Sequence, residues 1–257
     1  MQAQVQVQVQ AEELSPNFFP TQSQTKSREE RRYSRMDRDE QAVHRFTPGR
    51  IPVVRRQPAV ERLSRTMDVS VAFIGMILSI PILLLSILLI KLTSKGPAFF
   101  CQIRVGEGGR LFRMYKLRTM VIDAERQKSL LLARNEMSGP VFKIRRDPRI
   151  TWVGQYLRKF SIDEFPQFWN VLIGDMSIVG PRPPLPREVK KYKRWQLQRL
   201  MVKPGLTCLW QVSGRNSIGF EDWVRLDIRY IQKRSFWLDC KIILQTFKVV
   251  FFRPDGT

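Results

Sequence analysis

The stretch VSVAFIGMILSIPILLLSILLI, residues 69–90, contains no charged side chain. An apolar run of about 20 residues is long enough to form a membrane helix. Pro81 stands in the middle of the run, where it removes one backbone hydrogen bond and kinks or breaks a helix at a cost of about 3 kcal/mol. We therefore predict that Pro81 is a structural break between two shorter apolar helices.

Positive side chains flank this run on both sides, with Arg62 and Arg65 before it and Lys91 and Lys95 after it. Segments rich in Lys and Arg stay on the cytoplasmic side of a membrane, so a single span would place one of these clusters on the wrong side. A re-entrant helix-break-helix over residues 61–93 leaves both clusters on the same side. An ordinary kinked span is the alternative.

The charge balance of the chain restricts its partners. The 257 residues include 44 Lys and Arg against 23 Asp and Glu, a net charge of +21. Such an excess favours anionic partners, namely nucleic acid, phospholipid headgroups or phosphorylated small molecules. The hydrophobic content of 43% is enough for about one globular domain.

Several classes of catalytic site are excluded by the cysteines and the histidine. Cys101, Cys208 and Cys240 are far apart and form no CxxC pair, which argues against disulfides and a zinc site. The only histidine, His44, lies in a polar segment. Chemistry of the Ser-His-Asp or Cys-His type, and histidine-ligated metals, are therefore not expected.

Three regions follow along the chain. Residues 1–60 form a polar and basic leader, which we predict to be disordered. The re-entrant membrane segment, 61–93, comes next, and residues 94–257 form a domain that faces the cytosol. This domain mixes short strands with helices, so the predicted fold class is α+β and mostly helical.

The local patterns of residues 94–257 predict several elements. GEGG separates FFCQIRV from RLFRMYKLRTM and indicates a β-hairpin, because glycine permits a positive φ in the turn. A phosphate-binding loop is a weaker interpretation. TWVGQYLRKF and FEDWVRLDIRYIQK have helical spacing of apolar residues. FWLDCKIILQTFKVVFF is typical of a helix at a membrane interface, with a buried core helix as the alternative.

The acidic pair in FSIDEFPQFWNVLIGDMSIVGPRP, residues 160–183, has two interpretations. Ser161 and Glu164 have the spacing of a helix capping box, although Pro166 fits poorly inside such a helix. Alternatively, Asp163 stays ionised at a helix N-terminus and attacks phosphorus. Glu164 would then supply an oxygen ligand for Mg²⁺. A cap and a catalytic role are compatible.

Basic side chains in the same domain could bind a phosphorylated substrate, although each alone is more often a solvated surface charge. PRPPLP has a stiff backbone and could present its arginine to a phosphate, which a guanidinium binds through two hydrogen bonds. The candidate phosphate-binding residues are Lys116, Arg118, Arg158, Arg182 and Arg215.

From about Arg62 onward the sequence resembles the bacterial sugar transferase family, the monotopic polyprenyl-phosphate phosphoglycosyl transferases. The resemblance rests on the proline-containing apolar run and on IKLTSKGPAFF, YKLRTM, DEFPQ, NVLIGDMSIVGPRP and VKPGLTCLWQVSGR, which follow the family's order. In one departure, Ile80 rather than serine precedes Pro81, and Ser79 stands one residue earlier.

The resemblance implies a function. Members transfer a sugar 1-phosphate from a UDP-sugar to undecaprenyl phosphate, and so start exopolysaccharide or other surface glycan synthesis. Asp163 would be the nucleophile that forms a covalent phospho-sugar intermediate and displaces UMP, with Glu164 as its partner at Mg²⁺. The VKPGLTCLWQVSGR segment favours glucose or galactose as the sugar.

The same resemblance places the protein on the cytoplasmic face of the bacterial inner membrane, in contact with anionic lipids. It implies no nucleic-acid partner, and it is compatible with a homo-oligomer. The alternative function is a non-enzymatic, membrane-anchored scaffold that binds anionic lipid or nucleic acid through its basic face. An ordinary single-span protein whose soluble domain has another function is a third possibility.

Overall fold

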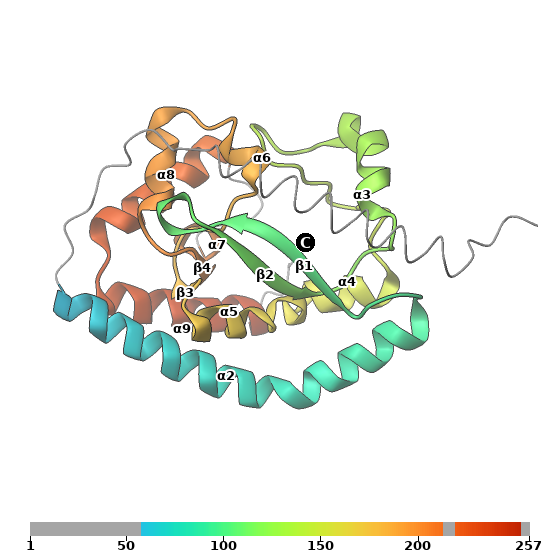
Figure 1. Ribbon diagram of the computed structural model, residues 1–257, viewed down its shortest axis with the longest axis horizontal. Helices are drawn as coiled ribbons and strands as arrows, with labels where there is room; N and C mark the ends of the chain where they lie inside the picture. The colour runs from blue at the N-terminus through green and yellow to red at the C-terminus, as the bar shows by residue number, and fades with distance from the viewer. Residues whose placement is uncertain (1–57, 213–218, 253–257) are drawn as a thin grey trace, which may run out of the picture. The chain divides into compact units, whose positions relative to one another are not determined.

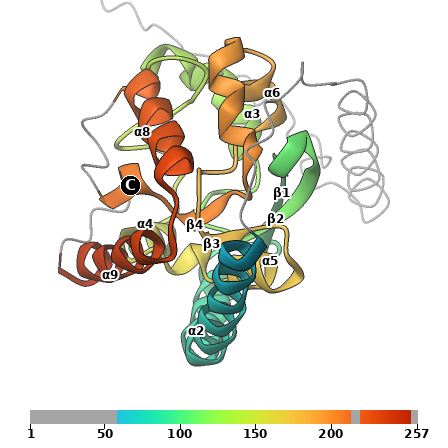
Figure 2. The same cartoon turned by 90° about the vertical axis from the view of Figure 1, so that its left-hand side faces the viewer.

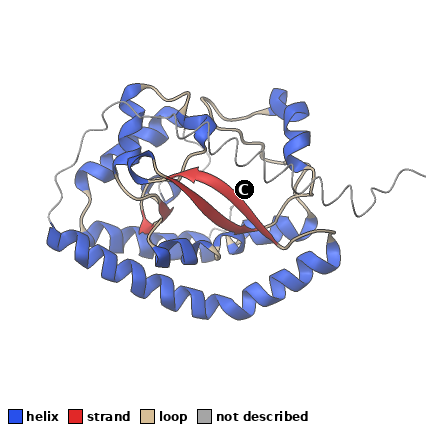
Figure 3. Ribbon diagram, viewed as in Figure 1, coloured by secondary structure: helices blue, strands red, loops and turns tan. Residues whose placement is uncertain are grey.

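The computed structural model describes residues 58–212 and 219–252, with side chains up to Val250. Most of the predicted leader, residues 1–57, and the candidate residue Arg215 lie outside the described residues. Figure 3 shows that the described chain is mostly helical with few strands, which confirms the α+β class.

The other helices and strands lie on one side of the long N-terminal helix (Figures 1 and 2). The α-helices are α2 (Pro58–Thr93), α3 (Ala124–Gln127), α4 (Trp152–Lys159), α5 (Gln167–Ile173), α6 (Pro186–Val189), α7 (Leu209–Val212), α8 (Phe220–Lys233) and α9 (Phe236–Phe252). The strands are β1 (Phe99–Val105), β2 (Leu111–Leu117), β3 (Ser177–Val179) and β4 (Gly205–Thr207).

Helix α2 runs for 36 residues with Pro81 inside it, so the predicted break between two helices is wrong. A proline removes only one hydrogen bond, and the turns beside it keep theirs. The hydroxyl of Ser79 donates to the carbonyl of Met76 at 2.8 Å, and that of Ser86 to Ile82 at 2.7 Å. Figure 1 shows α2 as a bent helix, which is the usual effect of an internal proline.

The apolar surface of α2 is largely uncovered by the rest of the domain. Only 17% of its most apolar 18-residue window is buried, and the helix is long and apolar enough to cross a membrane by length and composition alone. Its exposed side chains include Phe73, Ile77, Leu78, Leu84 and Leu88. Exposed apolar area of this extent marks a contact with a membrane or a protein partner.

The N-terminal half of α2 is fixed to the domain by buried polar contacts. The carboxylate of Asp68 accepts hydrogen bonds from the Ser177 hydroxyl at 2.9 Å and from the Ile178 backbone N–H at 2.8 Å, at the start of β3. Arg65 donates to the Val171 carbonyl near the end of α5 at 2.7 Å. The orientation of α2 relative to β3 and α5 is therefore set by specific hydrogen bonds.

Strands β1 and β2 pair antiparallel, with Phe99 opposite Leu117 and Val105 opposite Leu111. The turn between them contains Gly108, with φ 66°, and this left-handed geometry is one that glycine adopts without strain. The hairpin predicted from GEGG is confirmed.

The helices predicted from TWVGQYLRKF, FEDWVRLDIRYIQK and FWLDCKIILQTFKVVFF are also confirmed, as α4, α8 and α9. Thr151 caps α4 by accepting from the Gly154 N–H at 3.0 Å. Figures 1 and 2 show α4, α5 and α9 in one layer next to α2. The hairpin and α8 lie on the other side of this layer.

Strands β3 and β4 pair in parallel and approach so closely at one point that two glycines are required. A Cβ atom on Gly205 would lie 2.0 Å from the Gly180 nitrogen. Real Cβ atoms do not approach a nitrogen to this distance, so any larger residue would separate the strands.

We therefore predict that Gly205→Ala destabilises the protein by about 3 kcal/mol, a typical cost of overpacking a rigid core. Gly108→Asn is the control, because a Cβ there meets no heavy atom within 4 Å and asparagine tolerates a positive φ. Thermal unfolding in detergent should show a clear decrease in Tm for the first variant and little change for the second. Equal melting temperatures would contradict the close approach of the strands.

Candidate active site

The acidic pair lies in a short 3₁₀ helix, Ile162–Glu164, between α4 and α5. The predicted capping box is absent, since the Ser161 side chain makes no capping hydrogen bond. Ser161 directly follows α4 and has φ 56°, a left-handed geometry common after a helix C-terminus, whereas an N-cap residue needs an extended backbone. Pro166 is the residue before α5, where its missing N–H costs nothing.

Asp163 is almost completely buried, with 7% of its surface exposed. Burial is the main cause that raises its pKa to about 6; Lys116 and Arg158 act to lower the pKa, and Glu164 acts to raise it. We predicted that a helix N-terminus keeps this carboxylate ionised, but burial raises its pKa instead of leaving it low. Near neutral pH the ionised form still predominates.

Glu164 and Lys116 form an ion pair, with 2.7 Å between the carboxylate and the ammonium nitrogen. Lys116 comes from β2, so the hairpin places one cation beside the acidic pair. Both side chains keep partial access to solvent. The structure thus brings together three of the candidate residues, Asp163, Glu164 and Lys116.

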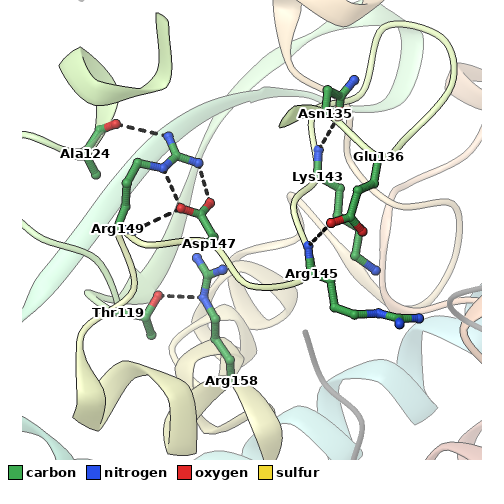
Figure 4. A network of polar contacts seen from close by, with 9 residues as sticks. All are labelled: Thr119, Ala124, Asn135, Glu136, Lys143, Arg145, Asp147, Arg149 and Arg158. Carbon is green, nitrogen blue, oxygen red and sulfur yellow. Dashed lines mark hydrogen bonds and ion pairs between the residues drawn. The ribbon is translucent and has the colours of Figure 1, made fainter. Parts of the chain in front are cut away.

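Arg158 on α4 is the fourth member of this group. Its Nε donates to the Thr119 hydroxyl at 2.9 Å, which fixes the direction of the side chain (Figure 4). Burial lowers the pKa of Arg158, and the negative charge of Asp163 is the largest effect that raises it. Arg158 is therefore a partly buried cation in the electrostatic field of the acidic pair.

A buried ion pair behind Arg158 was missed by the sequence interpretation. Arg149 donates to both carboxylate oxygens of Asp147, at 2.8 and 2.6 Å, and to the Ala124 carbonyl at 3.0 Å. Figure 4 shows Asp147 between Arg149 and Arg158. The available signal was the DPR sequence, where a proline joins opposite charges in an otherwise basic segment.

Arg118 does not point to the acidic pair in any hydrogen bond among the described residues; its guanidinium binds residues that follow α2. Its guanidinium is buried and donates to the hydroxyl and the carbonyl of Ser94 and to the carbonyl of Lys95, just after α2. These contacts fasten the C-terminal end of α2 to the hairpin. A phosphate contact for Arg118 stays a prediction, while its observed contacts are structural.

Arg182 is exposed, and its guanidinium lies 5.6 Å from the centre of the Trp223 ring. It stands between β3 and α6, in the segment that contains three prolines. The predicted role of Arg215 cannot be compared with the structure, because residues 213–218 lie outside the described residues.

The side chains near Asp163 could bind Mg²⁺ only if other ligands complete its coordination shell. Within the described part of the chain, no group of three or more His, Cys, Asp or Glu side chains converges as a metal cage would. Two adjacent carboxylates, Asp163 and Glu164, are nevertheless what Mg²⁺ commonly uses when phosphate oxygens and water complete its shell. The residues fit a magnesium ion that is shared with a phosphorylated substrate.

Residues 59–253 match the family described as bacterial sugar transferase. The chain belongs to this family. Among curated relatives of this chain, the galactosyl transferase CpsE of Streptococcus agalactiae serotype III is 51% identical over 189 residues, which cover 72% of the chain and 41% of the relative. The undecaprenyl-phosphate galactose phosphotransferase of Salmonella typhimurium is 42% identical over 199 residues, which cover 76% of the chain and 41% of that relative.

Shorter relatives match over most of their length. The exopolysaccharide production protein ExoY of Rhizobium meliloti is 35% identical over 209 residues, which cover 80% of this chain and 92% of ExoY. The chain therefore spans about two fifths of the first two relatives and nearly all of the third.

The raised pKa of Asp163 has a consequence for stability. Between the usual value of 3.8 and about 6 the folded protein holds a proton that the unfolded chain has lost, so stability decreases as the pH rises through this window. We predict that Asp163→Asn, which cannot ionise, is more stable than the wild type at pH 8, by roughly 1–3 kcal/mol.

The advantage of Asp163→Asn should be small near pH 4, where the folded wild-type carboxyl is protonated and the unfolded one is about half protonated. Thermal unfolding from pH 4 to 8 measures the difference. Asp222→Asn, which changes an exposed aspartate on α8, is the matched control and should show no such pH-dependent gain. A constant difference across this range would show that burial does not raise the pKa of Asp163.

Proposed function

We propose that this protein transfers a sugar 1-phosphate from a UDP-sugar to undecaprenyl phosphate and releases UMP, as the first step in the synthesis of an exopolysaccharide or other surface glycan. The observation that carries the proposal is the buried Asp163, adjacent to Glu164 and in the field of Lys116 and Arg158. A carboxylate with a cationic environment can approach an anionic phosphate that would otherwise repel it.

The proposed reaction has two steps. In the first, a carboxylate oxygen of Asp163 forms a bond to the phosphorus that carries the sugar, and the bond from this phosphorus to the bridging oxygen of the diphosphate breaks, so that UMP leaves. In the second, an oxygen of undecaprenyl phosphate attacks the same phosphorus and the carboxylate leaves. The bond from the sugar carbon to its oxygen is never broken, so the anomeric configuration is retained.

The surrounding side chains have distinct roles in this proposal. Burial raises the pKa of Asp163, which makes it a better nucleophile when ionised, while Lys116 and Arg158 limit this rise and keep most of it ionised at neutral pH. Arg182 is available to the diphosphate, and Arg215 stays a candidate from sequence alone. When bound, Mg²⁺ would be held by Glu164 and would neutralise phosphate charge.

The exposed side chains on one side of the domain support the proposal of a lipid substrate. Helices α2, α4, α5 and α9 lie next to one another, and each has exposed apolar or aromatic side chains. Tryptophan and tyrosine concentrate at the boundary between lipid and water. The exposed aromatic residues of α4, α5 and α9 are Trp152, Tyr156, Trp169, Trp237 and Phe247.

These exposed side chains favour an interfacial position for α9, and with it the cytoplasmic face of the inner membrane. The 44 basic residues of the chain would add attraction to anionic lipids. The short 3₁₀ helix with the acidic pair lies between α4 and α5, so such a membrane contact would hold the reacting phosphates near the headgroups.

The sugar is proposed to be galactose or glucose. The names of CpsE and of the Salmonella relative refer to galactose. Glucose stays in the proposal because the VKPGLTCLWQVSGR segment is similar to that of members that use either sugar. A scaffold that only binds anionic lipid would have no use for a buried acidic pair, because burial of a carboxylate is costly.

The covalent intermediate provides a direct test. We predict that enzyme incubated with UDP-galactose or UDP-glucose alone, without lipid acceptor, releases UMP and gains a hexose phosphate on the peptide that contains Asp163. Mass spectrometry of the trapped enzyme detects this adduct, and the preferred sugar gives the larger yield.

The matched variants are Asp163→Asn and Glu164→Gln. The first should show no adduct and at least about 10³-fold slower turnover, while it still folds and reaches the membrane. The second should be impaired most at low Mg²⁺. Lipid product without any adduct would establish direct transfer between the two substrates, and absence of both would favour a scaffold.

Membrane topology provides a separate test. If α2 enters and leaves the membrane on the cytoplasmic side, cysteines introduced singly at Gln57 and Lys95, in a variant without Cys101, Cys208 and Cys240, should both resist an impermeant thiol reagent in intact cells. Both should react once the cells are opened. Labelling at Gln57 alone in intact cells would show that α2 spans the membrane.

A further inference from the structure

The segment that carries Arg182, residues 181–184, has the sequence PRPP and connects β3 to α6. Its three prolines have no N–H group, so the backbone can be held from outside almost only through its carbonyl oxygens. A segment of this kind keeps one conformation only if neighbouring elements supply donors.

All four carbonyl oxygens of this segment have a donor. Two of the donors are backbone N–H groups of β4 and β1, and the other two are guanidinium groups of buried arginines. In chain order from Pro181 to Pro184, the donors are the Gly205 N–H (3.0 Å), a terminal nitrogen of Arg199 (3.2 Å), a terminal nitrogen of Arg104 (2.8 Å) and the Val105 N–H (2.9 Å).

Arg104 has a more specific arrangement than a surface arginine. It is 6% exposed, and its other terminal nitrogen donates to the Gln102 side chain at 2.7 Å, which fixes the plane of the guanidinium. Burial and then the charge of Arg182 lower the pKa of Arg104 to about 9, while Glu188 acts in the opposite direction. Two cations therefore lie close enough to repel each other.

This arrangement differs from that of Arg199. Arg199 also forms an ion pair with Asp227 at 2.7 Å, with both side chains buried, so it belongs to the core around α8. Arg104 has no comparable acidic partner in direct contact among the described residues. Arg104 donates hydrogen bonds to the Pro183 carbonyl and to the side chain of Gln102 in its own strand, β1.

We propose that Arg104 is a positioning residue for substrate binding: through the Pro183 carbonyl it fixes the PRPP segment so that the exposed guanidinium of Arg182 faces the diphosphate of the UDP-sugar. The inference rests on the proposed function, because it takes its ligand from there. A bound diphosphate would also offset the repulsion between the two arginines, which gives the site a preference for anions.

Binding is the appropriate measurement, because a positioning residue changes affinity through Arg182. The background is Asp163→Asn, in which the covalent step should not occur, and the measured quantity is the Kd for UDP-galactose or UDP-glucose at fixed Mg²⁺. Arg104→Met should weaken binding about tenfold. Arg104→Lys, which keeps the charge but can reach only one acceptor, should recover part of this loss.

Arg110→Met is the matched control. Arg110 lies in the same hairpin, its side chain is 73% exposed and it pairs with Asp175 at 2.9 Å, so the change removes the same charge without touching the PRPP segment. Binding should change by less than about twofold. An equal loss in the two methionine variants would overturn the inference, because long-range charge alone would then explain the effect.

A double-mutant cycle with Arg182→Ala separates positioning from general damage. If Arg104 acts through Arg182, Arg104→Met should weaken binding only slightly once Arg182 is absent. A tenfold loss in both backgrounds would overturn the inference. If the wild type binds the UDP-sugar without turnover, the proposed function is overturned, but the double-mutant cycle still tests the role of Arg104. If the wild type does not bind the UDP-sugar at all, the proposed function and the inference are both overturned.

Discussion

The contact of Asp68 with the start of β3 is the constraint on which the arrangement of this protein depends. A carboxylate on the apolar helix α2 accepts two hydrogen bonds from the domain, at Ser177 and Ile178. The same α2 packs against α5, and α5 begins three residues after Glu164. The position of α2 and the position of the acidic pair are thus mechanically linked.

The electrostatics of the site follow from one acidic side chain that is buried close to cations. Asp163 is buried near cations that come from β2 and α4. Burial raises the pKa of its carboxyl, and these cations offset part of the rise. The Asp147–Arg149 pair adds a second, compensated layer behind Arg158. Lys116 and Glu164 keep partial access to solvent, whereas the carboxylate of Asp163 is buried.

Local features of the fold were readable from sequence, because they depend on neighbouring residues. GEGG predicted the hairpin through the conformational freedom of glycine, and apolar periodicity predicted α4, α8 and α9. Two local patterns failed for tertiary reasons. Pro81 only bends α2, because the turns around it persist, and Ser161 is forced into a left-handed geometry by the end of α4.

The candidate site was predictable in part. The residue types of Asp163, Glu164, Lys116 and Arg158 indicated phosphate chemistry, and the structure brings these four together. Sequence could not separate Arg118, which holds a helix end, from an arginine that is free to bind a ligand, because this depends on carbonyl groups of residues Ser94 and Lys95. The role of Arg104 toward Pro183 depends on a contact 79 residues away.

Helix α2 is fastened at both ends to the same body, through Arg65 and Asp68 near its start and through Arg118 just after its end. Its bent middle lies between these two attachments and carries exposed apolar side chains. If α2 lies in a bilayer, as proposed, a change in bilayer thickness would exert a bending load on this helix. The load would be passed through Asp68 and Arg65 to β3 and α5, and through Arg118 to the hairpin that carries Lys116. The thickness of a membrane would then act on the acidic pair through α5 and the hairpin.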